Sequence, residues 1–302
     1  MYRLPYRLLV DLKIMELQSL SEGDPEVVKK PSRERHGLEI RNEQHTMSSI
    51  NDVTRKIRKA FRIATSAYTL RALFKGCAAG VEHEDLISLT QSECVVDIGA
   101  NRGQFALVCR KNLPKAMIYS FEPLQEPAKV FEKVFQGDPR VKLFHCAVGP
   151  EMSQKTIHVS MQDDSSSLLP ISLQSKVFPG TEEKESRAIE MCPLNAVLTA
   201  DNIVAPALLK IDVQGYEMEV LRGCESLLSC FEYVYIECSF IELYEGQALA
   251  YQVIDYLHAH GFHFAGVYNL YYRSGKAIQG DFLFLKSHHK GTSNEFATGL
   301  TA

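Results

Sequence analysis

Short apolar blocks alternate with amphipathic blocks between residues 84 and 286. Apolar runs typical of buried strands lie at 94–99, 116–123, 141–149, 207–215, 232–238, 262–268 and 281–286. Stretches with the apolar spacing of helices lie at 84–91, 103–113, 126–137, 216–229 and 248–261. Because strands and helices alternate, the pattern predicts an α/β fold in which helices cover both faces of a doubly wound, mostly parallel sheet.

Two segments interrupt this alternation. Residues 150–206 show no clear period, so no regular element is predicted there. Residues 269–280 join the last two predicted strands and are too few for a crossover helix with its turns. We therefore expect the last strand of the sheet to run antiparallel to its neighbours.

The N-terminal part of the chain differs from the rest. It is charged, it contains Pro25 and Pro31, and it shows no regular period, which is typical of a disordered tail. A basic amphipathic helix follows, with Ile57, Phe61 and Ala64 on one face; a solvated basic face is favoured over membrane contact. The expected organisation is a disordered tail at 1–46, a helical lead-in at 47–83, the α/β domain at 84–290 and a disordered C-terminal tail at 291–302.

Composition narrows the class of partner. The 302 residues are 45% hydrophobic and 23% charged, with a net charge of −4, and the basic residues are scattered rather than gathered as in nucleic-acid-binding proteins. No stretch approaches the roughly 18 apolar residues of a membrane span, and no export signal is recognisable. The 8 cysteines form no C-x-x-C pair, which suits a reducing compartment. These features predict a cytoplasmic protein that acts on small molecules and binds no nucleic acid.

The segment VVDIGANRGQFAL, residues 95–107, carries the first candidate site. Its strand ends with Asp97, and the following turn holds Gly99 and Gly103, with Asn101 where a dinucleotide-binding turn needs its second glycine. A diphosphate would be repelled by Asp97. The ammonium and sulfonium groups of S-adenosylmethionine suit a carboxylate, and its own carboxylate suits the amides that begin the next helix.

A second acid follows the next strand, YSFEP. Glu122 stands where a carboxylate accepts hydrogen bonds from both ribose hydroxyls of a nucleoside, and Pro123 closes the strand. NAD-binding proteins use the same device, so Glu122 alone is ambiguous. Together with the turn after Asp97, it favours S-adenosylmethionine.

Several motifs together resemble the FkbM-type methyltransferases, a branch of the Rossmann-like S-adenosylmethionine-dependent enzymes. They are VVDIGANRGQFAL, FEP, SSSLL, LKIDVQGYEMEVLRG and the acid-bearing YVYIEC, and the resemblance covers residues 84–287. It implies the class I methyltransferase fold, with a seven-stranded sheet whose last strand is antiparallel. It also implies O-methylation of a hydroxyl on a sugar, a glycan or a polyketide-like molecule.

The resemblance also assigns site residues. The residues expected to bind the cofactor are Asp97, Gly99, Ala100, Asn101, Gly103, Gln104, Phe105, Glu122, Pro123, Ala147, Ser167 and Asp212. Asp212 is placed at the transfer site. Many members carry glutamate where this chain has Gln214, so this chain lacks the second carboxylate that could bind a metal or act as a base there, and no metal is expected.

Methyl transfer to a hydroxyl benefits from a base, because a neutral hydroxyl is a poor nucleophile. Asp212 ends the apolar strand ALLKID at the same edge of the sheet as Asp97, which makes it the preferred base. A role as helix cap or cofactor anchor stays open. Glu237 is the second candidate, whereas His145 is interpreted as a core residue.

Two kinds of segment are expected around the reacting groups. The polar loop at 161–170 either lines the cofactor mouth or is simply solvated. The aromatic segments 239–247 and 267–275 follow strand ends, and their rings suit a sugar face, although a structural or dimer role is as reasonable. The residues expected to bind the acceptor are Gln214, Tyr244, Tyr268 and Tyr271.

Three functions are therefore compared. The first is an S-adenosylmethionine-dependent O-methyltransferase with a small-molecule or glycan acceptor. The second is an NAD-dependent oxidoreductase, which Asn101 disfavours. The third is a module that binds a nucleotide without catalysis.

Overall fold

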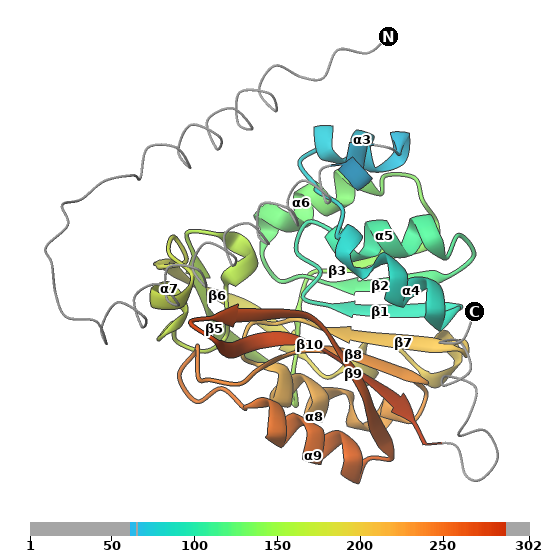
Figure 1. Cartoon of the computed structure of the whole chain (residues 1–302). Helices are drawn as coiled ribbons and strands as arrows, with labels where there is room; N and C mark the ends of the chain where they lie inside the picture. Colours follow the sequence, from blue (N-terminus) through green and yellow to red (C-terminus); the bar gives the residue numbers. More distant parts are fainter. Residues whose placement is uncertain (1–60, 65, 288–302) are drawn as a thin grey trace, which may run out of the picture. The chain divides into compact units, whose positions relative to one another are not determined.

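A seven-stranded sheet forms the centre of the computed structural model, which describes residues 61–64 and 66–287 (Figure 1). The strands lie in the order β3-β2-β1-β7-β8-β10-β9. Their bounds are β1 Cys94–Ile98, β2 Met117–Phe121, β3 Val141–Phe144, β7 Ala207–Ile211, β8 Tyr233–Ser239, β9 Phe262–Arg273 and β10 Lys276–Lys286. Strands β3, β2, β1, β7 and β8 are parallel, and β10 is antiparallel to both β8 and β9. The predicted doubly wound sheet with an antiparallel last strand is confirmed.

The chain reverses its direction of travel across the sheet at β1. From β1 it proceeds to β2 and β3 on one side, and it later returns to place β7 on the other side. The helices that follow β1 and β7 lie on opposite faces and leave a crevice at the carboxyl ends of these two strands. Ligands of open α/β sheets bind at this switch point.

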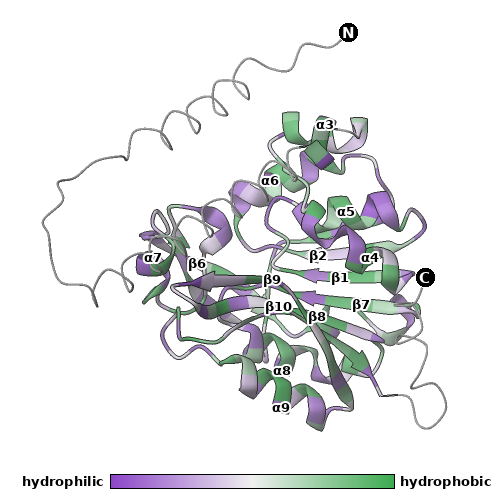
Figure 2. Ribbon diagram, viewed as in Figure 1, coloured by the Kyte–Doolittle hydropathy of each residue, from purple (hydrophilic) through white to green (hydrophobic). Residues whose placement is uncertain are grey.

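Helices cover both faces of the sheet (Figure 1). Their bounds are α3 Ala67–Phe74, α4 Glu84–Thr90, α5 Gln104–Asn112, α6 Gln125–Val134, α7 Gln174–Val177, α8 Glu217–Leu228 and α9 Ala250–Ala259. Neighbouring residues of β1 face the helices on opposite sides of the sheet. Val95 packs in the same cluster as α4 and α5, whereas Val96 packs in the same cluster as α8 and α9. Hydrophobic and hydrophilic residues alternate along α5 and α9 (Figure 2), as expected for helices with one buried face.

A second, three-stranded sheet replaces a helix in the crossover from β3 to β7. It consists of β4 Ala147–Val148, β5 Ser153–Ser160 and β6 Glu183–Cys192, in the order β4-β6-β5. The prediction that 150–206 holds no regular element is wrong, and so is the single strand predicted at 141–149. Only a small apolar cluster that includes Ile157, Ile189 and Met191 packs on this sheet, so its strands carry too few apolar residues to show a period.

The prediction that residues 269–280 form only a connection is also wrong, because most of them belong to the two strands of a long hairpin. Strands β9 and β10 continue to a turn at Ser274–Gly275. The extension runs past the edge of the main sheet, where Ile278 packs with Leu243 and Tyr244. Polar residues in this extension interrupt the apolar alternation by which a strand is recognised in the sequence. The antiparallel direction predicted for the last strand is correct.

The N-terminal expectations are tested only in part. Residues 61–64 are helical, as predicted. Phe61 is 70% exposed and Ala64 is exposed, whereas Ile63 is buried. The prediction that Phe61 and Ala64 lie on the buried face of this helix is therefore wrong. The tails predicted at 1–46 and 291–302, together with Ile57, lie outside the described residues. Within the described part of the chain, no helix is long and apolar enough to cross a membrane.

The two sheets meet where α8 contacts the turn after β4. A Cβ atom on Gly223 would lie 2.3 Å from the backbone oxygen of Gly149. Backbone cannot retreat as a flexible side chain can. The glycine therefore allows helix and turn to approach closely.

We predict that Gly223→Ala lowers the melting temperature, although alanine is favoured over glycine in a helix by about 1 kcal/mol. The added methyl group forces α8 away from Gly149, and overpacking of this kind costs about 1–3 kcal/mol. Ser226→Ala, on the exposed side of the same helix, is the control and is expected to keep or slightly raise the melting temperature. Equal melting temperatures for both variants would show that the contact is not tight.

Candidate functional site

A cavity of about 410 Å³ opens at the carboxyl ends of the central strands, a size typical of small-molecule sites. The predicted site residues that line it are Gly99, Ala100, Asn101, Gln104, Phe105, Glu122, Pro123, Ala147, Asp212 and Gln214. The remaining predicted residues do not line it and are Asp97, Gly103, Ser167, Glu237, Tyr244, Tyr268 and Tyr271. The predicted residues thus mark the position of the cavity but make up only part of its lining.

The turn after β1 lies directly against the end of β7. Gly99 has φ +79°, and a Cβ atom there would lie 1.8 Å from the backbone oxygen of Asp212. Only glycine fits this position. Gly103 instead faces Phe131 and Phe135 in the core. The first amides of α5, at Gln104 and beyond, have no partner within the helix and border the cavity.

Asp97 does not reach the cavity, because it is completely buried beneath Lys210. The Lys210 Nζ atom lies 3.1 Å from Asp97 Oδ1 and 3.8 Å from Asp212 Oδ2, and it donates a hydrogen bond of 2.9 Å to the Gly99 oxygen. Burial alone would lower the pKa of Lys210, but the charges of Asp97 and Asp212 outweigh it and raise the pKa. Direct contact between Asp97 and a ligand cation, which the sequence predicted, is not available, since the buried carboxylate pairs with the nearest internal cation.

Lys210 is thus a cavity residue that the sequence analysis missed. In the sequence, Lys210 is recognisable as a single lysine within the apolar run ALLKI. In the structure, it is paired with Asp97 on the neighbouring strand. A lysine buried in a central strand requires a carboxylate partner. The pairing of β1 with β7 supplies that partner, and the sequence pattern did not specify this register.

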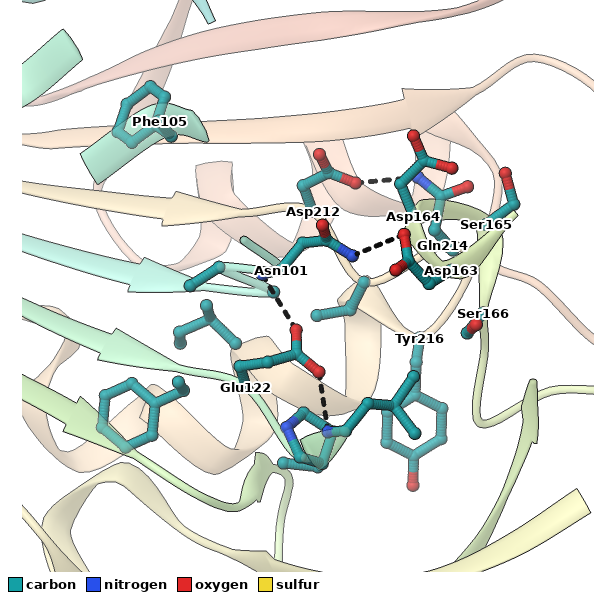
Figure 3. Close-up of a pocket in the computed structure, with 18 of the residues that line it drawn as sticks. Asn101, Phe105, Glu122, Asp163, Asp164, Ser165, Ser166, Asp212, Gln214 and Tyr216 are labelled. Carbon is teal, nitrogen blue, oxygen red and sulfur yellow. Dashed lines mark hydrogen bonds between the residues drawn. The ribbon is translucent and has the colours of Figure 1, made fainter. Parts of the chain in front are cut away.

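Glu122 presents its carboxylate to the cavity from the end of β2 (Figure 3). Oε1 accepts the Leu124 N–H at 2.7 Å, and Oε2 accepts the Asn101 N–H at 2.9 Å. Burial raises the pKa of Glu122 to about 7, although these two hydrogen bonds lower it. Each oxygen keeps a second lone pair. The group is therefore fixed in place and still able to accept hydrogen bonds from a diol.

A loop from the small sheet closes one side of the cavity. Asp163 accepts a hydrogen bond of 2.6 Å from the Arg102 guanidinium, which ties this loop to the turn after β1. Asp164, Ser165 and Ser166 line the cavity (Figure 3). Ser167 is buried and donates to the Gln214 backbone oxygen at 2.6 Å. The hydroxyls predicted at the cavity mouth are thus those of Ser165 and Ser166, while Ser167 holds the loop in place.

The opposite wall is a network of amides and carboxylates. Gln214 Nε2 donates to Asp212 Oδ1 and to Glu237 Oε2, both at 2.8 Å. Gln279 Nε2 donates to the other Glu237 oxygen at 2.9 Å. Glu237 therefore lies behind two cavity-lining amides, and its pKa is raised by burial and by the charge of Asp212. Asp212, with its side chain 38% exposed, is the carboxylate of this wall that faces the cavity.

The tyrosines predicted to hold an acceptor pack elsewhere. Tyr244 is 1% exposed, and its hydroxyl donates to Gln214 Oε1 at 2.9 Å. Tyr271 packs on Phe178, and Tyr268 packs on Tyr235. The prediction that these rings present a face at the cavity rim is wrong, because Tyr244 and Tyr271 pack in the cluster between the hairpin and the segment after β8, and Tyr268 packs in the main core beside Tyr235.

His145 also differs from its prediction. It was interpreted as a core residue, but its side chain is 50% exposed and Nε2 lies 3.0 Å from Glu132 Oε1. The strand ends one residue earlier, at Phe144. His145 therefore lies in the turn, where its side chain reaches solvent.

Comparisons with known proteins identify a family model and several relatives. The model of the methyltransferase FkbM domain matches residues 97–264. The 2-O-methyltransferase NoeI of Sinorhizobium fredii is 27% identical over 189 residues, which are 58% of this chain and 76% of that protein. The hexuronic acid methyltransferase AglP of Haloferax volcanii is 23% identical over 147 residues, which are 49% of this chain and 56% of that protein.

A solved structure is similar as well. The methyltransferase FkbM from Methylobacillus flagellatus KT aligns with a TM-score of 0.43 and 15% identity, over 64% of this chain and 44% of that chain. The family model covers more than half of the present chain, including Glu122 and Asp212. The chain therefore belongs to the FkbM methyltransferase family, and it is an S-adenosylmethionine-dependent methyltransferase.

Proposed function

We propose that this enzyme transfers a methyl group from S-adenosylmethionine to a hydroxyl of a sugar or glycan. The observation that supports this most strongly is that Glu122 and Asp212 border one cavity at the switch point of the sheet. Both named relatives, the 2-O-methyltransferase and the hexuronic acid methyltransferase, bear names that fit such an acceptor. The NAD-dependent and non-catalytic alternatives find no support in the family match.

The lining of the cavity fits the cofactor part by part. Glu122 would accept the ribose hydroxyls with the lone pairs that Asn101 and Leu124 leave free. The first amides of α5 would bind the cofactor carboxylate. Apolar groups of Ala147 and Ile157 line the cavity and would contact the adenine. When bound, S-adenosylmethionine supplies an electrophilic methyl group.

Asp212 would act on the acceptor. A hydroxyl loses its proton as its oxygen gains the methyl group, and a carboxylate within hydrogen-bond reach takes that proton, typically a gain of 10²- to 10⁴-fold. Gln214 binds one Asp212 oxygen, so the other is oriented for the acceptor. Lys210 Nζ, 3.8 Å from that second oxygen, keeps the carboxylate at the cavity wall.

The first prediction concerns Glu122. Its ionised form accepts two hydroxyl hydrogen bonds, whereas the protonated form gives up one of these acceptor positions. With a pKa raised to about 7, ionisation grows between pH 6 and pH 8, so the cofactor Kd should fall by about tenfold across that range. Isothermal titration calorimetry measures this change.

Glu122→Gln is the test variant. It should weaken cofactor binding at pH 8 by at least about tenfold, because charge-assisted hydrogen bonds are lost, and it should remove the pH dependence seen in the wild type. Glu132→Gln, at an exposed position, is the matched control. An unchanged Kd in Glu122→Gln would place the ribose elsewhere.

The second prediction concerns Asp212. Asp212→Asn preserves size and hydrogen bonding but removes the base, so kcat should fall by at least about 100-fold while the cofactor Kd changes by less than about threefold. Asp201→Asn, at an exposed site away from the cavity, should leave both constants unchanged. If Asp212→Asn loses cofactor affinity in parallel with kcat, Asp212 is a cofactor anchor and not the base.

The acceptor class is tested by transfer of labelled methyl groups. The intact chain is incubated with labelled S-adenosylmethionine and panels of glycans, proteins and nucleic acids. We expect label in the glycan panel, at a hydroxyl located by tandem mass spectrometry. Label confined to the protein or nucleic-acid panel would overturn the carbohydrate assignment while leaving the methyltransferase assignment intact.

A further inference from the structure

His83 lines the cavity but takes no part in the proposed cofactor contacts or in proton removal by Asp212. It ends the short 3₁₀ turn η1 Val81–His83, just before α4. Its ring packs edge-on against Phe105, with 5.4 Å between the ring centroids, and its side chain is 19% exposed. The imidazole is therefore held firmly and still borders the space in which ligands bind.

One edge of the imidazole is bound to the protein. Nδ1 lies 3.0 Å from the Tyr235 hydroxyl. That hydroxyl donates its only proton to Asp281 Oδ2 at 2.9 Å, and Asn269 Nδ2 donates to the same oxygen at 2.8 Å. The Tyr235 oxygen can therefore only accept from His83. Asn269 Nδ2 also lies 3.3 Å from Nδ1, but its shorter hydrogen bond, of 2.8 Å, goes to Asp281 Oδ2, and that carboxylate oxygen lies 3.7 Å from Nδ1. The acceptors around Nδ1 therefore place the proton of the neutral ring on this nitrogen.

The other edge of the ring then carries a lone pair on Nε2. Nε2 has no hydrogen-bond partner within residues 61–64 and 66–287. A neutral nitrogen of this kind accepts a hydrogen bond from a hydroxyl and repels a carboxylate or phosphate. In its neutral form, the ring therefore offers a hydrogen-bond acceptor to a ligand in the cavity.

The strand order indicates which ligand His83 meets. The ribose acceptor Glu122 follows β2, whereas Tyr235 and Asp281 belong to β8 and β10, beyond β7. Gln279 on β10 lines the same cavity as His83 and donates to Glu237, which also accepts from the Gln214 amide that binds Asp212. Because the His83 ring contacts β8 and β9, it lies on the side of the cavity beyond β7, whereas the ribose acceptor Glu122 lies at the end of β2.

We propose that His83 Nε2 accepts a hydrogen bond from a second hydroxyl of the acceptor, beside the one that is methylated. This inference rests on the proposed transfer to a sugar or glycan and narrows it to acceptors with at least two hydroxyls on one face. Tyr235 and Asp281 are positioning residues, since they act only through the His83 ring. An acceptor that lacks the second hydroxyl leaves Nε2 unpaired and binds more weakly.

The protonation state of the ring is tested first and needs no acceptor. Long-range ¹H–¹⁵N correlation spectra of the labelled full chain distinguish the two neutral tautomers, and His83→Gln identifies the signal among the 10 histidines. We expect the Nδ1–H form at pH 8 in the wild type and its loss in Tyr235→Phe. An Nε2–H form in the wild type would overturn the proposal.

Steady-state kinetics with a glycan methylated in the panel test the contact itself. His83→Leu should raise the acceptor KM by at least about tenfold, leave kcat within about threefold and leave the cofactor Kd within about twofold. His83→Gln, whose side-chain oxygen can replace Nε2 as acceptor, should recover most of the lost affinity. Tyr235→Phe should raise KM in the same way and add nothing in the double variant with His83→Leu.

Matched controls separate this role from a structural one. His145→Leu and Tyr256→Phe, both outside the cavity, should match the wild type, and melting temperatures verify that each variant folds. A loss confined to kcat, or a loss of cofactor affinity, would overturn the proposal. If the wild type methylates no glycan at all, the proposed function fails, while the tautomer measurement still decides the state of His83.

Discussion

The buried ion pair between Asp97 and Lys210 is the interaction on which the rest of the site depends. Two charges in the interior of a sheet are tolerated only when each compensates the other. Lys210 also binds the Gly99 oxygen and lies near Asp212. One ammonium group thus connects the turn after β1 with the end of β7, the two segments that border the switch point.

The same row of the sheet extends this arrangement in both directions. Ser120 pairs with Asp97 across β2 and β1, and Tyr235 pairs with Lys210 across β8 and β7. The row ends near His83, which contacts the Tyr235 hydroxyl. A continuous line of buried polar side chains therefore lies beneath the cavity, and because each is fixed by its strand, the groups above it are held in a defined geometry.

The wall of the cavity that carries Asp212 joins its two carboxylates through amides. Gln214 joins Asp212 to Glu237 with one amide nitrogen and accepts the Tyr244 hydroxyl with its oxygen. A glutamate at this position would add a third negative charge and require a proton or cation to hold the group together. The glutamine removes that requirement, and it leaves Asp212 as the carboxylate of this wall that borders the cavity.

The sequence by itself determined the order of the central elements along the chain and the two acids that border the cavity. Strands such as CVVDI and ALLKI are buried on both faces and are apolar except for one charged residue each, and acids at or just after strand ends are visible without knowledge of the fold. The tertiary structure alone decided which polar groups meet across strands: that Asp97 pairs with Lys210, that Glu237 lies behind Gln214 and that Tyr244 is buried. These contacts depend on strand register and on the packing of the hairpin against the connection between β5 and β6. A local pattern of apolar residues contains neither, because it records only which side of its own strand or helix each residue faces.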